Sequence, residues 1–322
     1  MNENGKIALR VAYPQIFIWA SVAIITLLPD IQAAAIETKL PVLAFLIGAS
    51  IFLAILSAIG ATNKVAKLRL VRVLNFYDIC SIFLTLIFFW ELLANKIPVL
   101  DPMIFTCPTR IFQALVNKRD ILFSSSLSSM FLLVNGYFYG IFVGIVTGIV
   151  VGWFKSLFRV VYPVAKLIAP IPPVVYIPFA LVLLPSVTYA AIFIIGLGAF
   201  WPTFANVCFA THNVDRRVIE AAQMLGAKTS TIMRRVILPF VLPELFAGIF
   251  IGLILAFIML EVAEMVGASS GLGFYLLSQR LLNHYDVVSA IIVTVGILVI
   301  VCTVIFDYVE ARALRWKVRL GA

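Results

Sequence analysis

Long apolar runs separated by short polar segments set the pattern of this chain of 322 residues. A helix of about 20 apolar residues crosses a hydrocarbon core of about 30 Å, and several of the runs reach that length. We therefore predict eight membrane spans, at residues 14–29, 40–61, 76–94, 128–152, 160–184, 188–210, 240–262 and 286–308. The pattern predicts an all-α polytopic membrane protein, with a two-span hairpin at residues 1–72 followed by a six-span core at residues 73–322.

One segment between the predicted spans has an amphipathic pattern of its own. Residues 95–124 contain Pro98, Pro102 and Pro108, followed by a stretch with an apolar side. This order predicts an ordered cap outside the membrane, with an interfacial helix at about residues 109–117.

The fifth predicted span is unusually rich in proline. Its sequence, PVAKLIAPIPPVVYIPFALVLL, contains Pro163, Pro170, Pro172, Pro173 and Pro178. Each interior proline removes a helical hydrogen bond, so the span is predicted to bend or break near mid-bilayer. Backbone freed in this way is tolerated in a membrane only against protein or a watery cavity. Two interpretations remain open, a kink that serves packing and a helix that lines a pathway.

A second polar feature lies at the outer end of the seventh span, in LEVAEMVGASSGLGFYLL, residues 260–277. Glu261 and Glu264 are interpreted either as interfacial charges or as groups with a structural or gating role, because a carboxylate at mid-bilayer costs about 2.5–3.5 kcal/mol. The turn that follows supplies backbone freedom and small hydroxyl groups for a re-entrant or hinge segment. These come from Gly267, Gly271 and Gly273 and from Ser269 and Ser270.

Composition and charge support the membrane assignment and orient it. The chain is 63% hydrophobic and 12% charged, far more apolar than soluble domains. Its net charge of +9 would indicate nucleic acid in a soluble protein, but 17 of the 24 Lys and Arg residues fall on one side of the predicted topology. By the positive-inside rule both termini are cytoplasmic, and so is the loop 211–239. No cleavable signal is apparent, and the four cysteines show neither disulfide nor metal spacing.

The cytoplasmic loop is predicted to form a helical hairpin. Asp215 can cap a helix at residues 216–225, and Gly226 can end it in a left-handed conformation. A second helix is predicted from Thr229 or Ser230 through Arg235, with Pro239 marking entry into the next span. An apolar stripe is expected at helical spacing, formed by Val218, Ala222 and Leu225. Physical reasoning alone leaves two alternatives, a solvated loop and a docking site.

The spacing within this loop resembles a known family. Glu220-Ala221-Ala222, then Gly226, then Val236-Ile237-Leu238-Pro239 match the EAA loop of ABC importer permeases, with Val236 as the one departure. VLDPMIFTCPTRIFQALV, IAPIPPVVYIPF and VAEMVGASSGLGFYL are also similar to segments of that family, the last to its sulfonate, taurine and nitrate branch. The resemblance covers about residues 75–318 and leaves the N-terminal hairpin outside.

The resemblance implies a type I ABC importer fold in the bacterial inner membrane, in which two identical permease chains form the pathway. It implies two ABC ATPase subunits, which would bind ATP and Mg, and an extracytoplasmic binding protein that delivers the solute. This chain would carry no catalytic residue, cofactor or metal and would bind no nucleic acid. The implied ATPase-coupling residues are Arg216, Arg217, Glu220, Ala221, Ala222, Gly226, Leu238 and Pro239. The implied path or gate residues are Pro170, Pro172, Pro173, Tyr176, Pro178, Glu264, Ser269, Ser270 and Gly271.

Other functional classes fit less well. LGAKTST lacks the glycines of a phosphate-binding loop, so ATP hydrolysis on this chain is not expected. An ion-coupled secondary transporter remains the alternative, with Glu261, Glu264 or Asp78 as its coupling site. A membrane-embedded enzyme would need a convergent nucleophile, base or metal set, which the sequence does not offer. The branch resemblance implies a small anion as solute, such as a sulfonate, taurine, nitrate or bicarbonate.

Overall fold

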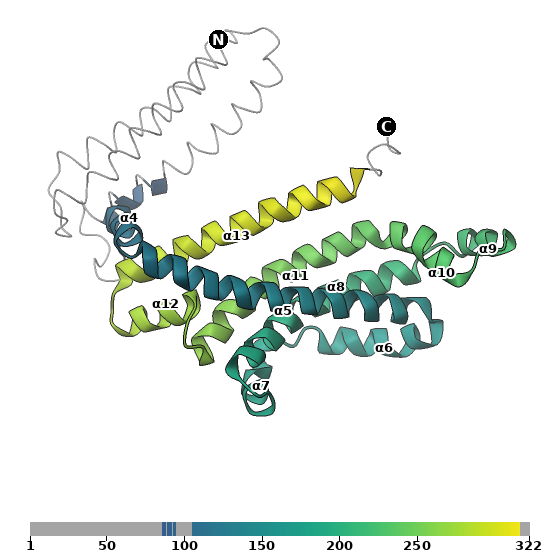
Figure 1. Cartoon of the computed structure of the whole chain (residues 1–322), viewed down its shortest axis with the longest axis horizontal. Coiled ribbons are helices and arrows are strands. Elements are labelled where there is room, and N and C mark those ends of the chain that lie inside the picture. Colours follow the sequence, from purple (N-terminus) through teal and green to yellow (C-terminus); the bar gives the residue numbers. More distant parts are fainter. Residues whose placement is uncertain (1–85, 88, 92, 95–104, 316–322) are drawn as a thin grey trace, which may run out of the picture. The chain divides into compact units, whose positions relative to one another are not determined.

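The computed structural model describes residues 86–87, 89–91, 93–94 and 105–315. Every regular element from residue 105 onward is helical (Figure 1). In chain order these are α4 (Pro108–Asn117), α5 (Arg119–Trp153), α6 (Lys155–Ile168), η3 (Pro173–Tyr176), α7 (Ile177–Leu183), α8 (Val187–His212), α9 (Arg216–Met224), α10 (Thr229–Ile232), η4 (Met233–Ile237), α11 (Leu238–Gly267), α12 (Leu272–Leu281) and α13 (Tyr285–Ala313). The chain divides into two compact units, Met1–Arg119 with Gln279–Ile291 and Asp120–Ser278 with Ile292–Ala322.

Four helices in the described part are long and apolar enough to cross a membrane: Arg119–Trp153, Val187–His212, Thr229–Gly267 and Tyr285–Ala313. They contain four of the predicted spans, 128–152, 188–210, 240–262 and 286–308, which are therefore confirmed as apolar helices. The predicted amphipathic helix at 109–117 is also confirmed, as α4. The predicted N-terminal hairpin, Asp78 and most of the predicted span 76–94 lie outside the described residues.

The predicted break in the proline-rich span is confirmed. Helix α6 ends at Ile168, and the chain resumes as η3 and α7 after a bend of 87°. Pro170 and Pro172 lie in the break, where the missing N–H groups and the restricted preceding residues stop α6 from continuing. Pro173 begins η3 and Pro178 lies in the first turn of α7, where a helix tolerates proline.

A seam of five glycines brings α5 against α8. Gly136, Gly140, Gly144, Gly148 and Gly152 follow one another at four-residue spacing on one side of α5, and all are buried. A Cβ at Gly140 would overlap the carbonyl oxygen of Gly196 on α8. Small residues at this spacing let two membrane helices approach closely enough to pack backbone against backbone.

Helix α11 packs on an adjoining side of α8 by the same means, and Ala199 and Thr203 contact both α5 and α11. Gly248 and Gly252 of α11 face Thr203 and Ala199 of α8, where a Cβ would stand 3.1 Å and 3.2 Å from their Cα atoms. The Tyr137 hydroxyl on α5 donates a 2.9 Å hydrogen bond to the carbonyl oxygen of Ile249 on α11. Helices α5, α8 and α11 therefore form a closely packed three-helix core.

Helix α6 is joined to α8 by stacked aromatic rings. The Phe158 ring stacks on His212 with 3.6 Å between ring centroids, and on Tyr162 at 4.6 Å. These contacts lie at the end of α8 from which α9 follows, so the first part of the broken span is fixed to the core at that end.

Candidate functional site

The predicted hairpin is present, and its first arm forms as expected. Asp215 Oδ1 accepts a 2.9 Å hydrogen bond from the Arg217 amide, capping the first turn of α9. The predicted apolar stripe is only partly right. Ile219 and Ala222 pack toward the cluster around Ile237, whereas Val218 and Leu225 are exposed. The partly buried side of α9 is therefore rotated from the expected stripe. Ile219, which is larger than the neighbouring Val218, takes the partly buried position.

Gly226 ends α9 in the way the sequence predicts. Its φ is +76°, a left-handed conformation that glycine adopts without steric cost. The Gly226 amide donates to the carbonyl oxygen of Gln223 at 2.9 Å, and the Ala227 amide donates to that of Ala222 at 3.0 Å. These bonds use carbonyl groups that the helix end leaves without partners. A Cβ at Gly226 would meet nothing within 4 Å, so backbone conformation alone requires the glycine.

The second arm differs from the prediction of a separate helix ending before Pro239. The helix begins at Thr229 as predicted, but residues Thr229–Gly267 form one continuous helix of 39 residues, so the predicted end at Arg235 was wrong. The reason is a π-helical turn at Met233–Ile237, in which the Leu238 amide donates to the carbonyl oxygen of Met233. The wider turn accommodates Pro239 in the first turn of α11, where its missing N–H is not needed. The hairpin's second arm is thus the end of a membrane helix.

The outer surface of the hairpin combines charge with exposed apolar groups. Arg216, Arg217, Glu220 and Ala221 are all exposed, while Ala222 and Pro239 are half-buried and Leu238 is exposed at the base. Met224 and Leu225 are 89% and 88% exposed, more than any other large apolar side chain of the described part. Sequence reasoning gave Met224 no role and placed Leu225 on the packed stripe. Exposed apolar groups of this size at a polar tip indicate a protein-binding surface.

A polar groove of about 500 Å³ runs beside α9. Arg216, Glu220 and Gln223 line it from α9, and Lys155 lines it from the start of α6. Ile219 of α9 also lines it, and the remaining lining residues come from the ends of α5 and α8 and from the following loop: Gly152, Trp153, Thr211, His212, Asn213 and Val214. The groove offers cations, a carboxylate and amides to a partner segment. The side of α9 that lines it therefore remains accessible.

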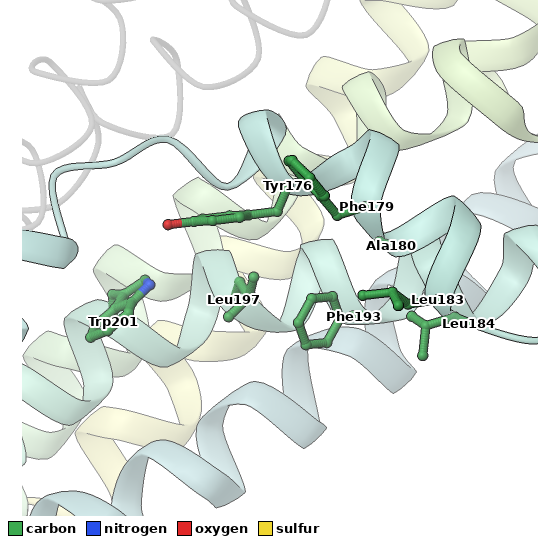
Figure 2. A pocket seen from close by; sticks show the side chains of 8 residues that line it. All are labelled: Tyr176, Phe179, Ala180, Leu183, Leu184, Phe193, Leu197 and Trp201. Carbon is green, nitrogen blue, oxygen red and sulfur yellow. The ribbon is translucent and has the colours of Figure 1, made fainter.

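An apolar cavity of about 370 Å³ lies between α7 and α8. Figure 2 shows the Tyr176 ring above the part of α8 that carries Leu197 and Trp201. The other lining residues are Phe179, Ala180, Leu183, Leu184 and Phe193. None of the lining residues is charged, so the cavity can hold apolar or aromatic groups but gives no site for a bare charge.

The turn between α11 and α12 is built around Glu264. This side chain is 0% exposed, so the alternative of an exposed interfacial charge does not hold for it. Its Oε2 accepts a 2.7 Å hydrogen bond from the Gly273 amide, while the Leu272 amide donates to Ser129 Oγ on α5 at 2.8 Å. Gly271 has φ +114°, and a Cβ there would overlap the Glu264 carboxyl. Sequence reasoning did not single out Ser129, and it assigned Gly273 backbone freedom in the turn but not the hydrogen bond to Glu264.

The predicted path or gate residues fall into two places. Tyr176 lines the apolar cavity, and the four prolines lie at or beside the break next to it. Glu264 and Gly271 are buried in the α11–α12 turn, where Ser269 and Ser270 are exposed. The two places adjoin at Gly267, where a Cβ would stand 3.5 Å from Leu181 of α7. Within the described part of the chain, no three His, Cys, Asp or Glu side chains gather as metal ligands.

Comparison with known proteins places this arrangement in a family. Residues 140–315 match the family described as the inner membrane component of binding-protein-dependent transport systems. An ABC transporter permease protein of Brucella abortus is 30% identical over 71% of this chain and 91% of its own length. One of Methanocaldococcus jannaschii is 32% identical over 47% of this chain, which spans 57% of that relative.

Relatives named for particular solutes also match, each over about half of its length. An aliphatic sulfonates permease of Bacillus subtilis is 32% identical over 39% of this chain and 46% of its own. The taurine permease of Escherichia coli is 31% identical over 48% of this chain and 56% of its own. A chain of the inward-facing MetNI methionine ABC transporter has the same fold, with a TM-score of 0.54 and 22% identity over 61% of this chain and 98% of its own.

Proposed function

The chain belongs to the family of inner membrane components of binding-protein-dependent transport systems, and we propose that two copies of it form the pathway of an ATP-driven importer. It is a permease of the ABC transporter class, and the type I importer fold expected from the sequence is confirmed. The finer assignments are proposals: two ATPase subunits that bind ATP and Mg, an extracytoplasmic binding protein, and a bacterial inner membrane as the location.

The observation that carries the proposal is the α9 hairpin. It presents Glu220 and Ala221 on an exposed surface, with Met224 and Leu225 at its tip and the polar groove at its base. We propose that this hairpin binds in a groove of the ATPase, with the exposed apolar pair buried on docking and the arginines and Glu220 fixing the orientation. Burying exposed apolar groups stabilises such an interface, and charged groups at its rim set partner and register.

The proposed topology follows from the distribution of Lys and Arg. We propose that both termini and the loop 211–239 are cytoplasmic, which places α9 on the side where ATP is available. Helices α5, α8 and α11 then cross the membrane, with the α11–α12 turn on the outer side. Residues 1–72 are proposed to be an extension outside the six-span permease core.

The proposed solute is a small anion of the sulfonate, taurine, nitrate or bicarbonate type. Support comes from the names of relatives, which include permeases for aliphatic sulfonates, taurine and nitrate. The apolar cavity beside Tyr176, with no charged lining residue, would give a passing anion no tight site. We therefore propose that the binding protein selects the solute, and that this permease lets it pass without holding it.

The test is co-purification of the ATPase together with solute uptake into proteoliposomes. Glu220→Arg and Gly226→Asp are expected to abolish both capture of the ATPase and ATP-dependent uptake. Glu310→Arg, which makes the same substitution on α13 beyond the predicted span 286–308, is the matched control and is expected to preserve both. Uptake that continues without ATP and follows an imposed ion gradient would instead establish the secondary transporter.

A further inference from the structure

One helix connects the two polar sites of this chain. Thr229–Gly267 is continuous over 39 residues, about 58 Å at 1.5 Å per residue. The α9 hairpin is attached to one end of it, and the Glu264 turn forms the other end (Figure 1). A displacement of the hairpin therefore reaches the turn through a single continuous helix.

Two hydrogen bonds in this turn hold the start of α12 against α11 and α5. Glu264 Oε2 accepts the Gly273 amide at 2.7 Å, and Ser129 Oγ accepts the Leu272 amide at 2.8 Å. These two amides belong to the first turn of α12, where a helix has no acceptors of its own. The Ser129 hydroxyl also lies beside the Glu264 carboxyl, so α5, α11 and α12 meet at one point.

Glycine makes this geometry possible at two positions. A Cβ at Gly271 would overlap the Glu264 carboxyl, and one at Gly273 would stand 2.7 Å from the carbonyl oxygen of Glu261. The backbone of the turn is therefore wrapped directly on the carboxyl group. Glu261 Oε1, one turn earlier on α11, is buried without a hydrogen-bond partner among the described residues, and so is Glu264 Oε1, so the bond to the Gly273 amide is made by Glu264 Oε2 alone.

We propose that Glu264 is a positioning residue, a clamp that makes the start of α12 follow the movements of the helix that carries the docking hairpin. This inference rests on the proposed function, because the movement it transmits would be driven by the ATPase. Without the clamp, α11 would still move with the hairpin, but the outer turn would no longer move with α11. ATP hydrolysis would then continue with less solute transported per ATP.

The clamp needs an acceptor oxygen at the length of a glutamate side chain, and it does not need a charge. Glu264→Gln keeps a carbonyl oxygen at the same place, so it is expected to keep the clamp. Glu264→Asp is one methylene too short to reach the Gly273 amide, and Glu264→Ala has no acceptor. An ion-coupling carboxylate would behave differently, because glutamine cannot bind or release a proton or a cation as a carboxylate does.

The experiment measures solute uptake per ATP hydrolysed in proteoliposomes containing the full transporter and its binding protein. Glu264→Ala leaves the buried Gly273 amide without its acceptor, a loss that corresponds to about tenfold, so this variant is expected to lower the ratio by about tenfold. Glu264→Gln is expected to stay within about twofold of the wild type, and so is Glu261→Ala, the matched control on the same helix. Co-purified ATPase is measured for each variant to separate coupling from assembly.

Amide hydrogen exchange over residues 268–276 reports on the clamp independently of transport. Protection of the Gly273 amide is expected in the wild type and in Glu264→Gln, and its loss in Glu264→Ala. If Glu264→Ala fails to assemble, Glu264→Asp and Ser129→Ala carry the same test, the latter through the Leu272 amide.

Three results would overturn the clamp: wild-type coupling in Glu264→Ala, a defect in Glu264→Gln as large as in Glu264→Ala, or an equal defect in Glu261→Ala. A wild-type protein without ATP-driven uptake would instead overturn the proposed function, and the exchange data would still decide whether the clamp exists.

Discussion

The glycine seam between α5 and α8 makes opposite predictions for two glycines of the same chain. At Gly140 an added Cβ would overlap the Gly196 carbonyl oxygen and stand 2.9 Å from its carbonyl carbon, so only backbone could move away. At Gly296, in α13, an added Cβ meets nothing within 4 Å. Both glycines lie inside long helices, so alanine improves helix propensity equally at each.

The magnitude follows from that comparison. Alanine stabilises a helix interior by about 0.5–1 kcal/mol relative to glycine, and this is the whole effect expected of Gly296→Ala. Gly140→Ala gains the same amount but must push α5 from α8, and overpacking of this kind costs about 1–3 kcal/mol. Since the propensity gain cancels between the two variants, their stabilities should differ by the overpacking cost alone, about 1–3 kcal/mol.

Unfolding in mixed micelles, followed by denaturant titration, measures that difference directly. Gly144→Ala is the graded case, since its Cβ would stand 3.1 Å from Phe200 O and from Thr203 Cβ, and it should fall between the other two. If Gly140→Ala proved as stable as Gly296→Ala, α5 would have space at its contact with α8. The close packing of these helices through glycines would then be refuted.

Three further predictions concern the hairpin and the core. Gly226→Ala should destabilise the left-handed end of α9 by about 1–2 kcal/mol, because a φ of +76° disfavours a Cβ, and Gly226→Asn should destabilise it less. Titration of the ATPase against each variant measures the resulting loss of docking affinity. Asp215→Ala removes the cap that bonds the Arg217 amide and should destabilise α9 by about 1 kcal/mol, seen as faster amide exchange in 216–224, whereas Asp215→Asn should not. Tyr137→Phe removes the bond to Ile249 and should lower the free energy of unfolding by about 1 kcal/mol, and an unchanged value would show that water replaces this bond.

Local signals in the sequence located the hairpin and the broken helix. Asp215 and Gly226 specify a cap and a left-handed end by their own chemistry, so α9 was predictable to within one residue at its C-terminus. The closely spaced Pro170, Pro172 and Pro173 likewise prevent α6 from continuing, because each lacks the N–H group of a helical hydrogen bond, whereas the single Pro163 lies inside α6. The spacing from Glu220 to Pro239 also identified the family, which physical reasoning about the loop alone could not do.

Features that depend on packing were less predictable. Pro239 was expected to separate two helices, but the π turn before it keeps the helix continuous. No residue pattern in Met233–Ile237 predicts that turn. The five glycines of α5 do carry a signal, since their four-residue spacing is visible in the sequence, but it does not name the partner helix. The burial of Glu264 depends on Ser129, 135 residues earlier, together with the backbone of Gly273.

The same contacts decide which parts of the chain can move independently. Backbone-to-backbone packing through glycines interlocks α5 with α8 and α8 with α11, so sliding within this core would create overlaps at every turn. Ile232, Ile237 and Val241 pack with Val207 and Ala210 of α8, which ties the base of the hairpin to the same core. A force on α9 would therefore displace the three helices as one body, as in rigid-body transitions. Among the described residues, the 87° break between α6 and α7 interrupts a predicted span, and Val182 and Leu183 close to it are exposed. If two copies form the pathway as proposed, access to it is expected to change by rocking of the two permease cores against each other.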